Sequence, residues 1–111
     1  MEDECFMDRL AMLNEILAQN PNDAFARYGV AMEYAKNGDA ERALNEFNKL
    51  LAANPEYTAG YFMAAQMLSR TGRNDEAKKM LRDGIASAQR TGNAHAQSEM
   101  EAMLEELAQE S

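Results

Sequence analysis

The chain contains 111 residues, of which 46% are hydrophobic and 27% are charged, as in ordinary globular proteins. This length predicts a single domain over residues 1–111, and no apolar run approaches the roughly 20 residues that span a bilayer, which argues against a membrane partner. The net charge of -8 argues against a nucleic-acid partner, because nucleic-acid binding requires clustered Lys and Arg.

The two ends of the chain carry most of its acidity. Residues 1–23 contain six acidic side chains against Arg9 alone, and residues 91–111 contain five glutamates without Lys or Arg. The acidic N-terminus lacks the basic residues that precede the apolar stretch of a secretory signal. The single cysteine, Cys5, rules out an internal disulfide. Together these features predict a cytoplasmic protein.

The first predicted element is a leading helix over residues 3–21. The helix should end at Asn20-Pro21, because the residue before a proline is disfavoured in the helical region. Its apolar residues follow the three- and four-residue spacing of a buried helical stripe, and they are Phe6, Leu10, Leu13 and Leu17.

A first repeat of two helices is predicted over residues 22–55. Asn22 or Asp23 can cap its first helix, since both side chains accept hydrogen bonds from backbone N–H groups. Gly38 should end that helix, because glycine adopts the left-handed conformation at little cost. Asp39 should then cap the second helix of the pair.

A second repeat is predicted over residues 56–90, followed by a C-terminal capping helix over residues 93–109. Asn54 is expected to cap the first helix of this repeat, with Pro55 at the first helical position, where a missing N–H costs nothing. Asn74 is expected to cap the second helix.

A period of thirty-four residues relates the two repeats. Such a period indicates stacked units, each of which buries its surplus apolar surface against a neighbour. The matching positions are Asn20-Pro21 and Asn54-Pro55, Gly38 and Gly72, Ala31 and Ala65, and Ala43 and Ala77.

This pattern resembles the tetratricopeptide repeat, in which each unit of thirty-four residues has two antiparallel helices, a turn glycine, small residues at the crossings and a closing proline. The match is close over residues 24–57, and residues 58–89 match well but lack the closing proline, where Gln89 stands. Other departures are Arg27 and Tyr61 in place of the common tryptophan, and Leu50 and Gly84 in place of alanine. The resemblance implies an all-α fold, a right-handed superhelical stack of antiparallel helix pairs with about six helices.

In this family the first helices of the repeats line a concave groove that binds an extended or helical peptide. The resemblance therefore implies non-catalytic protein–protein interaction, with a protein or peptide as partner. Carried over position by position, the partner-binding groove consists of Phe25, Tyr28, Met32, Lys36, Phe62, Met63, Gln66 and Arg70.

One well-studied subset of the family grips a carboxylate with Lys and Asn at positions that Tyr28 and Met32 occupy here. The carboxylate clamp is therefore missing. The aromatic and Met-rich positions that remain suit an apolar helix or segment of a partner.

Two other interpretations of this apolar surface stay open. The C-terminal helix can fold over it, so that Met100 and Met103 cover Phe62 and Met63 as ordinary core. Alternatively, the protein is a self-associating structural or assembly unit, a homo-oligomer that uses the same apolar surface or its terminal helices.

Basic residues gather in the second repeat, where an acidic partner could dock. The competing interpretation is a mixed-charge outer face that Asp75, Glu76 and Asp83 balance. The basic residues are Arg70, Arg73, Lys78, Lys79, Arg82 and Arg90.

The sequence offers little for catalysis, and it predicts neither an enzyme nor a cofactor. Cys5 and His95 lie ninety residues apart, too far for a thiol–imidazole pair in one array. His95 and Glu99 have the spacing of two metal ligands, but no second cluster completes a tetrahedral site. Phosphate-binding glycine motifs are absent from the sequence as well.

Overall fold

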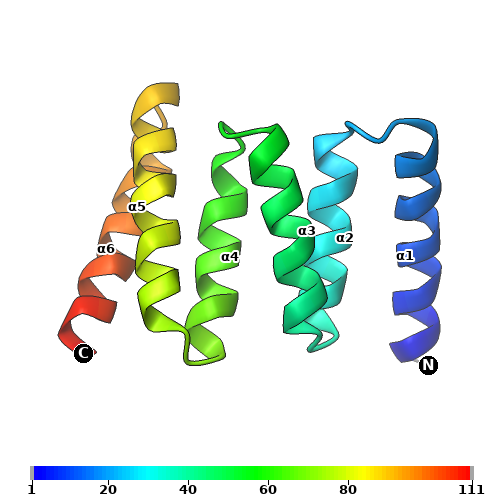
Figure 1. Ribbon diagram of the computed structural model, residues 1–111, viewed down its shortest axis with the longest axis horizontal. Coiled ribbons are helices and arrows are strands. Elements are labelled where there is room, and N and C mark those ends of the chain that lie inside the picture. Colours follow the sequence, from blue (N-terminus) through cyan, green and yellow to red (C-terminus); the bar gives the residue numbers. More distant parts are fainter. Residues whose placement is uncertain (1, 111) are drawn as a thin grey trace. The chain divides into compact units, whose positions relative to one another are not determined.

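The computed structural model describes residues 2–110, and every regular element among them is a helix (Figure 1). The helices are α1 (Glu2–Gln19), α2 (Ala24–Lys36), α3 (Ala40–Ala53), α4 (Thr58–Arg70), α5 (Asn74–Thr91) and α6 (Ala94–Glu110). The predicted all-α class is confirmed. Residues 1 and 111, which the predicted domain includes, lie outside the described residues.

The chain divides between Ala53 and Asn54 into two compact units. The N-terminal unit contains α1, α2 and α3, and the C-terminal unit contains α4, α5 and α6. Within each unit, successive helices run antiparallel and are joined by short turns (Figure 1). The predicted organisation as one domain of two repeats stays a prediction.

The predicted helix caps and the predicted helix break of the N-terminal unit are present. The Asp23 side chain accepts a hydrogen bond from the Ala26 N–H at 2.9 Å, which caps α2. Asp39 accepts one from the Arg42 N–H at 3.2 Å, which caps α3. Between these helices Gly38 has a φ of 81°, the left-handed conformation that favours glycine.

The predicted start of α4 was wrong. The helix begins at Thr58 rather than at Pro55, because residues 54–57 form a turn in which the Asn54 carbonyl accepts a hydrogen bond from the Tyr57 N–H at 3.0 Å. The Pro55 carbonyl is held by the Tyr61 hydroxyl at 2.8 Å. Asn54-Pro55 therefore forms part of a turn and does not cap the helix.

The predicted cap of α5 was also wrong. Asn74 is the first residue of the helix, and Arg73 occupies the N-cap position without a side-chain cap. The Arg73 guanidinium instead forms two hydrogen bonds to the Glu76 carboxylate, at 2.9 and 2.7 Å. This ion pair lies at the N-terminus of α5, where a negative side chain is favourable.

The core of the N-terminal unit lies between α2 and its two neighbours. Leu17 of α1 packs with Ala26 and Val30 of α2, and partly buried apolar side chains surround this cluster. On the α3 side, the fully buried Phe47 ring meets Tyr28 edge-on, with ring centroids 6.3 Å apart. Apolar residues from all three helices therefore hold α2 in the middle of the unit.

The core of the C-terminal unit depends on a glycine in α5. A Cβ at Gly84 would lie 2.5 Å from the Met100 sulfur of α6 and 2.6 Å from Cβ of Tyr61 in α4. Met100 is fully buried. A buried hydrogen bond of 2.9 Å between the hydroxyls of Thr58 and Ser87 links α4 to α5. The terminal helix α6 is therefore packed into this unit.

Candidate protein-interaction surfaces

The predicted groove residues of the first repeat lie on one face of α2. Phe25, Met32 and Lys36 follow the seven- and four-residue spacing of a helical stripe, with Tyr28 between them. Phe25 is 76% exposed, the highest value among the exposed large apolar residues of the described chain. Met32 is half-buried and Lys36 is exposed. These four residues are called the α2 stripe.

Tyr28 has a structural role within the α2 stripe. Its ring is half-buried and packs edge-on against Phe47, an arrangement that stabilises aromatic pairs beyond their buried area. At the end of the stripe, the Lys36 ammonium lies 3.7 Å from the carboxylate of Glu33, which is buried. Phe25 is thus the member with the most surface available to a partner.

In the second repeat, the predicted groove residues Phe62, Gln66 and Arg70 follow a four-residue spacing on α4, and Met63 lies beside Phe62. Phe62, Met63 and Gln66 are half-buried, and Arg70 at the end of the helix is exposed. These four residues are called the α4 stripe. The two stripes belong to different units, so the prediction that they form one groove stays a prediction.

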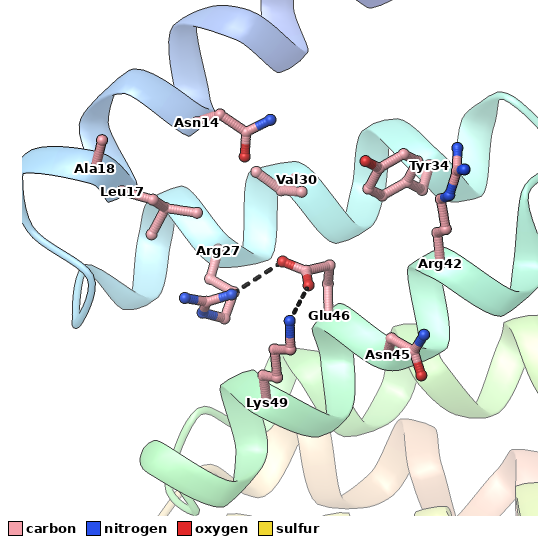
Figure 2. Close-up of a pocket in the computed structure, with 10 residues that line it drawn as sticks. All are labelled: Asn14, Leu17, Ala18, Arg27, Val30, Tyr34, Arg42, Asn45, Glu46 and Lys49. Carbon is pink, nitrogen blue, oxygen red and sulfur yellow. Dashed lines mark hydrogen bonds and ion pairs between the residues drawn. The ribbon is translucent and has the colours of Figure 1, made fainter.

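The structure also contains a cleft that the sequence did not predict. It has a volume of about 430 Å³ and lies in the N-terminal unit, between α1 and α3 with α2 at its base (Figure 2). All three helices contribute polar or charged side chains to its lining. The lining residues are Asn14, Leu17, Ala18, Arg27, Val30, Tyr34, Arg42, Asn45, Glu46 and Lys49.

A shared carboxylate organises the charges of this cleft. Glu46 accepts a hydrogen bond from Arg27 at 2.9 Å through one oxygen, and the Lys49 ammonium lies 3.3 Å from the other (Figure 2). The Arg27 and Glu46 side chains are only 21% and 14% exposed, so solvent screens this pair less than a surface ion pair. Arg42 lies over the Tyr34 ring, 5.9 Å from its centroid.

The cleft and the α2 stripe use opposite faces of α2. Arg27, Val30 and Tyr34 line the cleft, and their three- and four-residue spacing places them on one side of the helix. Arg27 follows Phe25 by two residues, a rotation of about 200° around the helix axis. The N-terminal unit therefore presents two separate surfaces.

The other residues that the sequence singled out do not converge. His95 is 87% exposed, and its Nε2 lies 3.2 Å from Glu99, while Cys5 is exposed on α1. Among the described residues, no three His, Cys, Asp or Glu side chains are grouped so that they could hold a metal ion. No helix in that part of the chain has the length and apolar character to cross a membrane.

The basic residues of the second repeat are partly paired with acids. Lys79 forms an ion pair with Asp83 at 2.9 Å, and Arg90 forms one with Glu56 at 2.7 Å. The hydrogen bond from Arg73 lowers the pKa of Glu76 below its ordinary value. These pairs fit the mixed-charge face that was the competing interpretation.

Comparison with known proteins decides the family. A family profile described as "Tetratricopeptide repeat" matches residues 34–104. The chain belongs to the tetratricopeptide repeat family. A TPR repeat-containing protein of Pseudomonas aeruginosa is 30% identical over 95 residues, which cover 86% of this chain and 90% of that protein. The resemblance predicted from the sequence is confirmed, and membership of this family supports a general role in protein interaction.

Solved structures agree with this assignment. The solution structure of a tetratricopeptide repeat domain protein from Salinibacter ruber is 31% identical, with a TM-score of 0.75, and the match covers 79% of this chain and 89% of that one. PcrH of Pseudomonas aeruginosa, crystallised with the chaperone binding region of PopD, has a TM-score of 0.87 at 18% identity and matches over 97% of this chain and 82% of its own. At 18% identity, the likeness to PcrH shows a shared fold and nothing more.

Proposed function

We propose that this tetratricopeptide repeat protein is a non-catalytic, cytoplasmic interaction module that binds an apolar helix or extended segment of a partner protein. The α2 stripe and the α4 stripe are the proposed binding surfaces. The single observation that carries the proposal is Phe25, a large aromatic side chain that is 76% exposed on a first helix of a repeat.

The chemistry of the α2 stripe supports an apolar ligand. An exposed phenylalanine offers a large apolar surface, and such residues are enriched at the centres of protein interfaces. Met32 lies two turns along the same face, and its flexible thioether adapts to partners of different shape. PcrH, which has the same fold, was crystallised with a segment of another protein. We therefore propose a peptide segment as the ligand of this chain.

Selection from a random peptide library displayed on phage tests the proposal and requires no identified partner. We expect enrichment of peptides with apolar side chains three or four residues apart, because that spacing places them on one face of a helix. Chemical-shift mapping with the enriched peptide should then perturb the α2 stripe or the α4 stripe. A selection that enriches no peptide, or shifts confined to other surfaces, would contradict the proposal.

A second candidate function is self-association through α1. Met12 and Ile16 lie one turn apart on that helix and are 57% and 41% exposed. Exposed apolar side chains in one patch are typical of interfaces, and a two-fold dimer would bury the patch of each copy against the other.

Sedimentation at micromolar concentration tests this second candidate. We expect the wild type to form dimers and the double variant Met12→Ser, Ile16→Ser to remain monomeric, because the polar hydroxyls remove the apolar surface. Met7→Ser serves as a control, since Met7 is 62% exposed and lies on another face of α1. A wild-type protein that stays monomeric over the whole range rules out self-association.

A further inference from the structure

From the charges and shape of the cleft in the N-terminal unit, we infer that it binds an acidic peptide segment of a partner protein, in which two carboxylates lie two positions apart. This surface is independent of the apolar binding proposed above, because it uses the other face of α2. Three cationic side chains line the cleft, Arg27, Arg42 and Lys49, against the single carboxylate of Glu46.

The cationic side chains retain hydrogen-bonding capacity for a ligand. Arg27 and Lys49 share one carboxylate between them, and Arg27 also donates to the Pro21 carbonyl at 3.3 Å. Arg42 lies 3.4 Å from Asp39, outside the cleft, and its side chain is 69% exposed. A guanidinium has five N–H donors and an ammonium has three, so these contacts leave donors available for an incoming carboxylate.

The spacing on α3 defines what the cleft can hold. Arg42 and Lys49 are seven residues apart on one face of the helix, a rise of about 10 Å. In an extended peptide, carboxylates two positions apart point to the same side and lie about 7 Å from each other, a separation that the long side chains of Arg42 and Lys49 can close. Leu17 and Val30 also line the cleft but are buried, so a ligand would meet mainly its charged and polar side chains.

The small number of cations in the cleft favours a short peptide over nucleic acid as the occupant. The cleft combines three cations with one carboxylate. Nucleic acid requires a longer row of cations along the phosphate backbone. A short acidic segment requires only two cations.

Fluorescence anisotropy with two matched probes tests the inference. The acidic probe is a dye-labelled twelve-residue peptide that repeats Asp-Leu-Glu, and its neutral counterpart repeats Asn-Leu-Gln. We expect the acidic probe to bind and the neutral probe to bind at least about tenfold more weakly, since two charge-assisted contacts are lost. Affinity should fall as salt rises, because salt screens partly exposed charges.

Three variants locate the binding. Arg42→Gln with Lys49→Gln should weaken the acidic probe about tenfold, whereas Lys79→Gln with Arg90→Gln, which removes the same charge from the C-terminal unit, should leave affinity unchanged. Glu46→Gln should strengthen binding about threefold, since it removes the carboxylate that competes for Arg27 and Lys49. A merely structural role for Glu46 would not produce this gain.

The outcomes separate this inference from the apolar binding. Phe25→Ser should leave the acidic probe unaffected, because Phe25 lies on the opposite face of α2. Equal affinity for the two probes, an unchanged affinity in the Arg42, Lys49 double variant, or tighter binding of a single-stranded oligonucleotide of equal length would overturn the inference. Thermal melting of each variant by circular dichroism confirms that the comparison is made between folded proteins.

Discussion

Gly84 leaves no room for a side chain between α5 and its neighbours. We expect Gly84→Ala to lower the free energy of unfolding by about 1–3 kcal/mol, because the new methyl group would lie 2.6 Å from Cβ of Tyr61, which cannot rotate away. Urea unfolding followed by circular dichroism measures this change.

Gly29 provides the matched control for this substitution. The atoms nearest to a Cβ there are the two methyl groups of Leu13, at 3.1 Å, and these belong to the end of a flexible side chain. Alanine also favours the helix over glycine by about 1 kcal/mol, which offsets the small shift. An equal loss of stability in both variants would contradict the packing described for Gly84.

Tyr61 should make the stability depend on alkaline pH. Burial raises the pKa of its hydroxyl above the ordinary value of 10.0, and the nearby Asp83 carboxylate raises this pKa further. The folded protein therefore keeps the proton to higher pH than the unfolded chain does, so this contribution to stability is fully present below pH 10 and is lost as pH rises through the folded pKa.

Tyr61→Phe isolates this effect. At neutral pH the variant should be less stable by about 1 kcal/mol, because it loses the hydrogen bond to the Pro55 carbonyl. That difference should shrink as pH rises above about 10, since only the wild type carries the ionising hydroxyl. Unfolding curves at several alkaline pH values measure it, and a constant difference would show that the hydroxyl does not titrate as described.

At the scale of the helices, the start of α2 depends on one side chain. Asp23→Ala should lower the free energy of unfolding by about 1 kcal/mol, because the Ala26 N–H loses its partner at 2.9 Å. Asp23→Ser retains an acceptor at the same position and should remain close to the wild type. Thermal unfolding of the two variants measures the difference, and identical losses would mean that the cap contributes nothing.

The same local chemistry explains how far the helices could be predicted from sequence. The caps at Asp23 and Asp39 and the break at Gly38 depend on neighbouring residues only, so they were predicted correctly. The predicted start of α4 was wrong, because Asn54-Pro55 is compatible with a β-turn as well as with a helix cap. The Tyr61 hydroxyl in α4 stabilises the β-turn through its hydrogen bond to the Pro55 carbonyl. That contact becomes visible only once the helix is in place.

The candidate sites show the same limit. The α2 stripe could be predicted from helical spacing. The core contact of Tyr28 could not, because it depends on where α3 places Phe47. The cleft was not predicted, because Arg27 and Lys49 come together only when α2 and α3 pack side by side. The only sequence signal was the three- and four-residue spacing of Arg42, Glu46 and Lys49 on one helix.

At the scale of the whole molecule, the protein is a tetratricopeptide repeat chain whose N-terminal unit carries two chemically different surfaces. The α2 stripe presents the exposed aromatic ring of Phe25, while the cleft on the other side of α2 is cationic. A partner with an apolar segment and an acidic segment could therefore contact both faces of one helix. Linked binding of this kind raises the overall affinity without any new contact.

The proposed function depends above all on the α2 stripe as the binding surface for an apolar segment. Calorimetry with the peptide enriched from the library is the decisive test, with wild type, Phe25→Ser and Met7→Ser compared under identical conditions. Both variants remove an exposed apolar side chain, of 76% and 62% exposure respectively. We expect Phe25→Ser to weaken binding about thirtyfold, or about 2 kcal/mol, and Met7→Ser to leave it unchanged. Equal affinity in all three proteins would contradict the proposed role of the stripe.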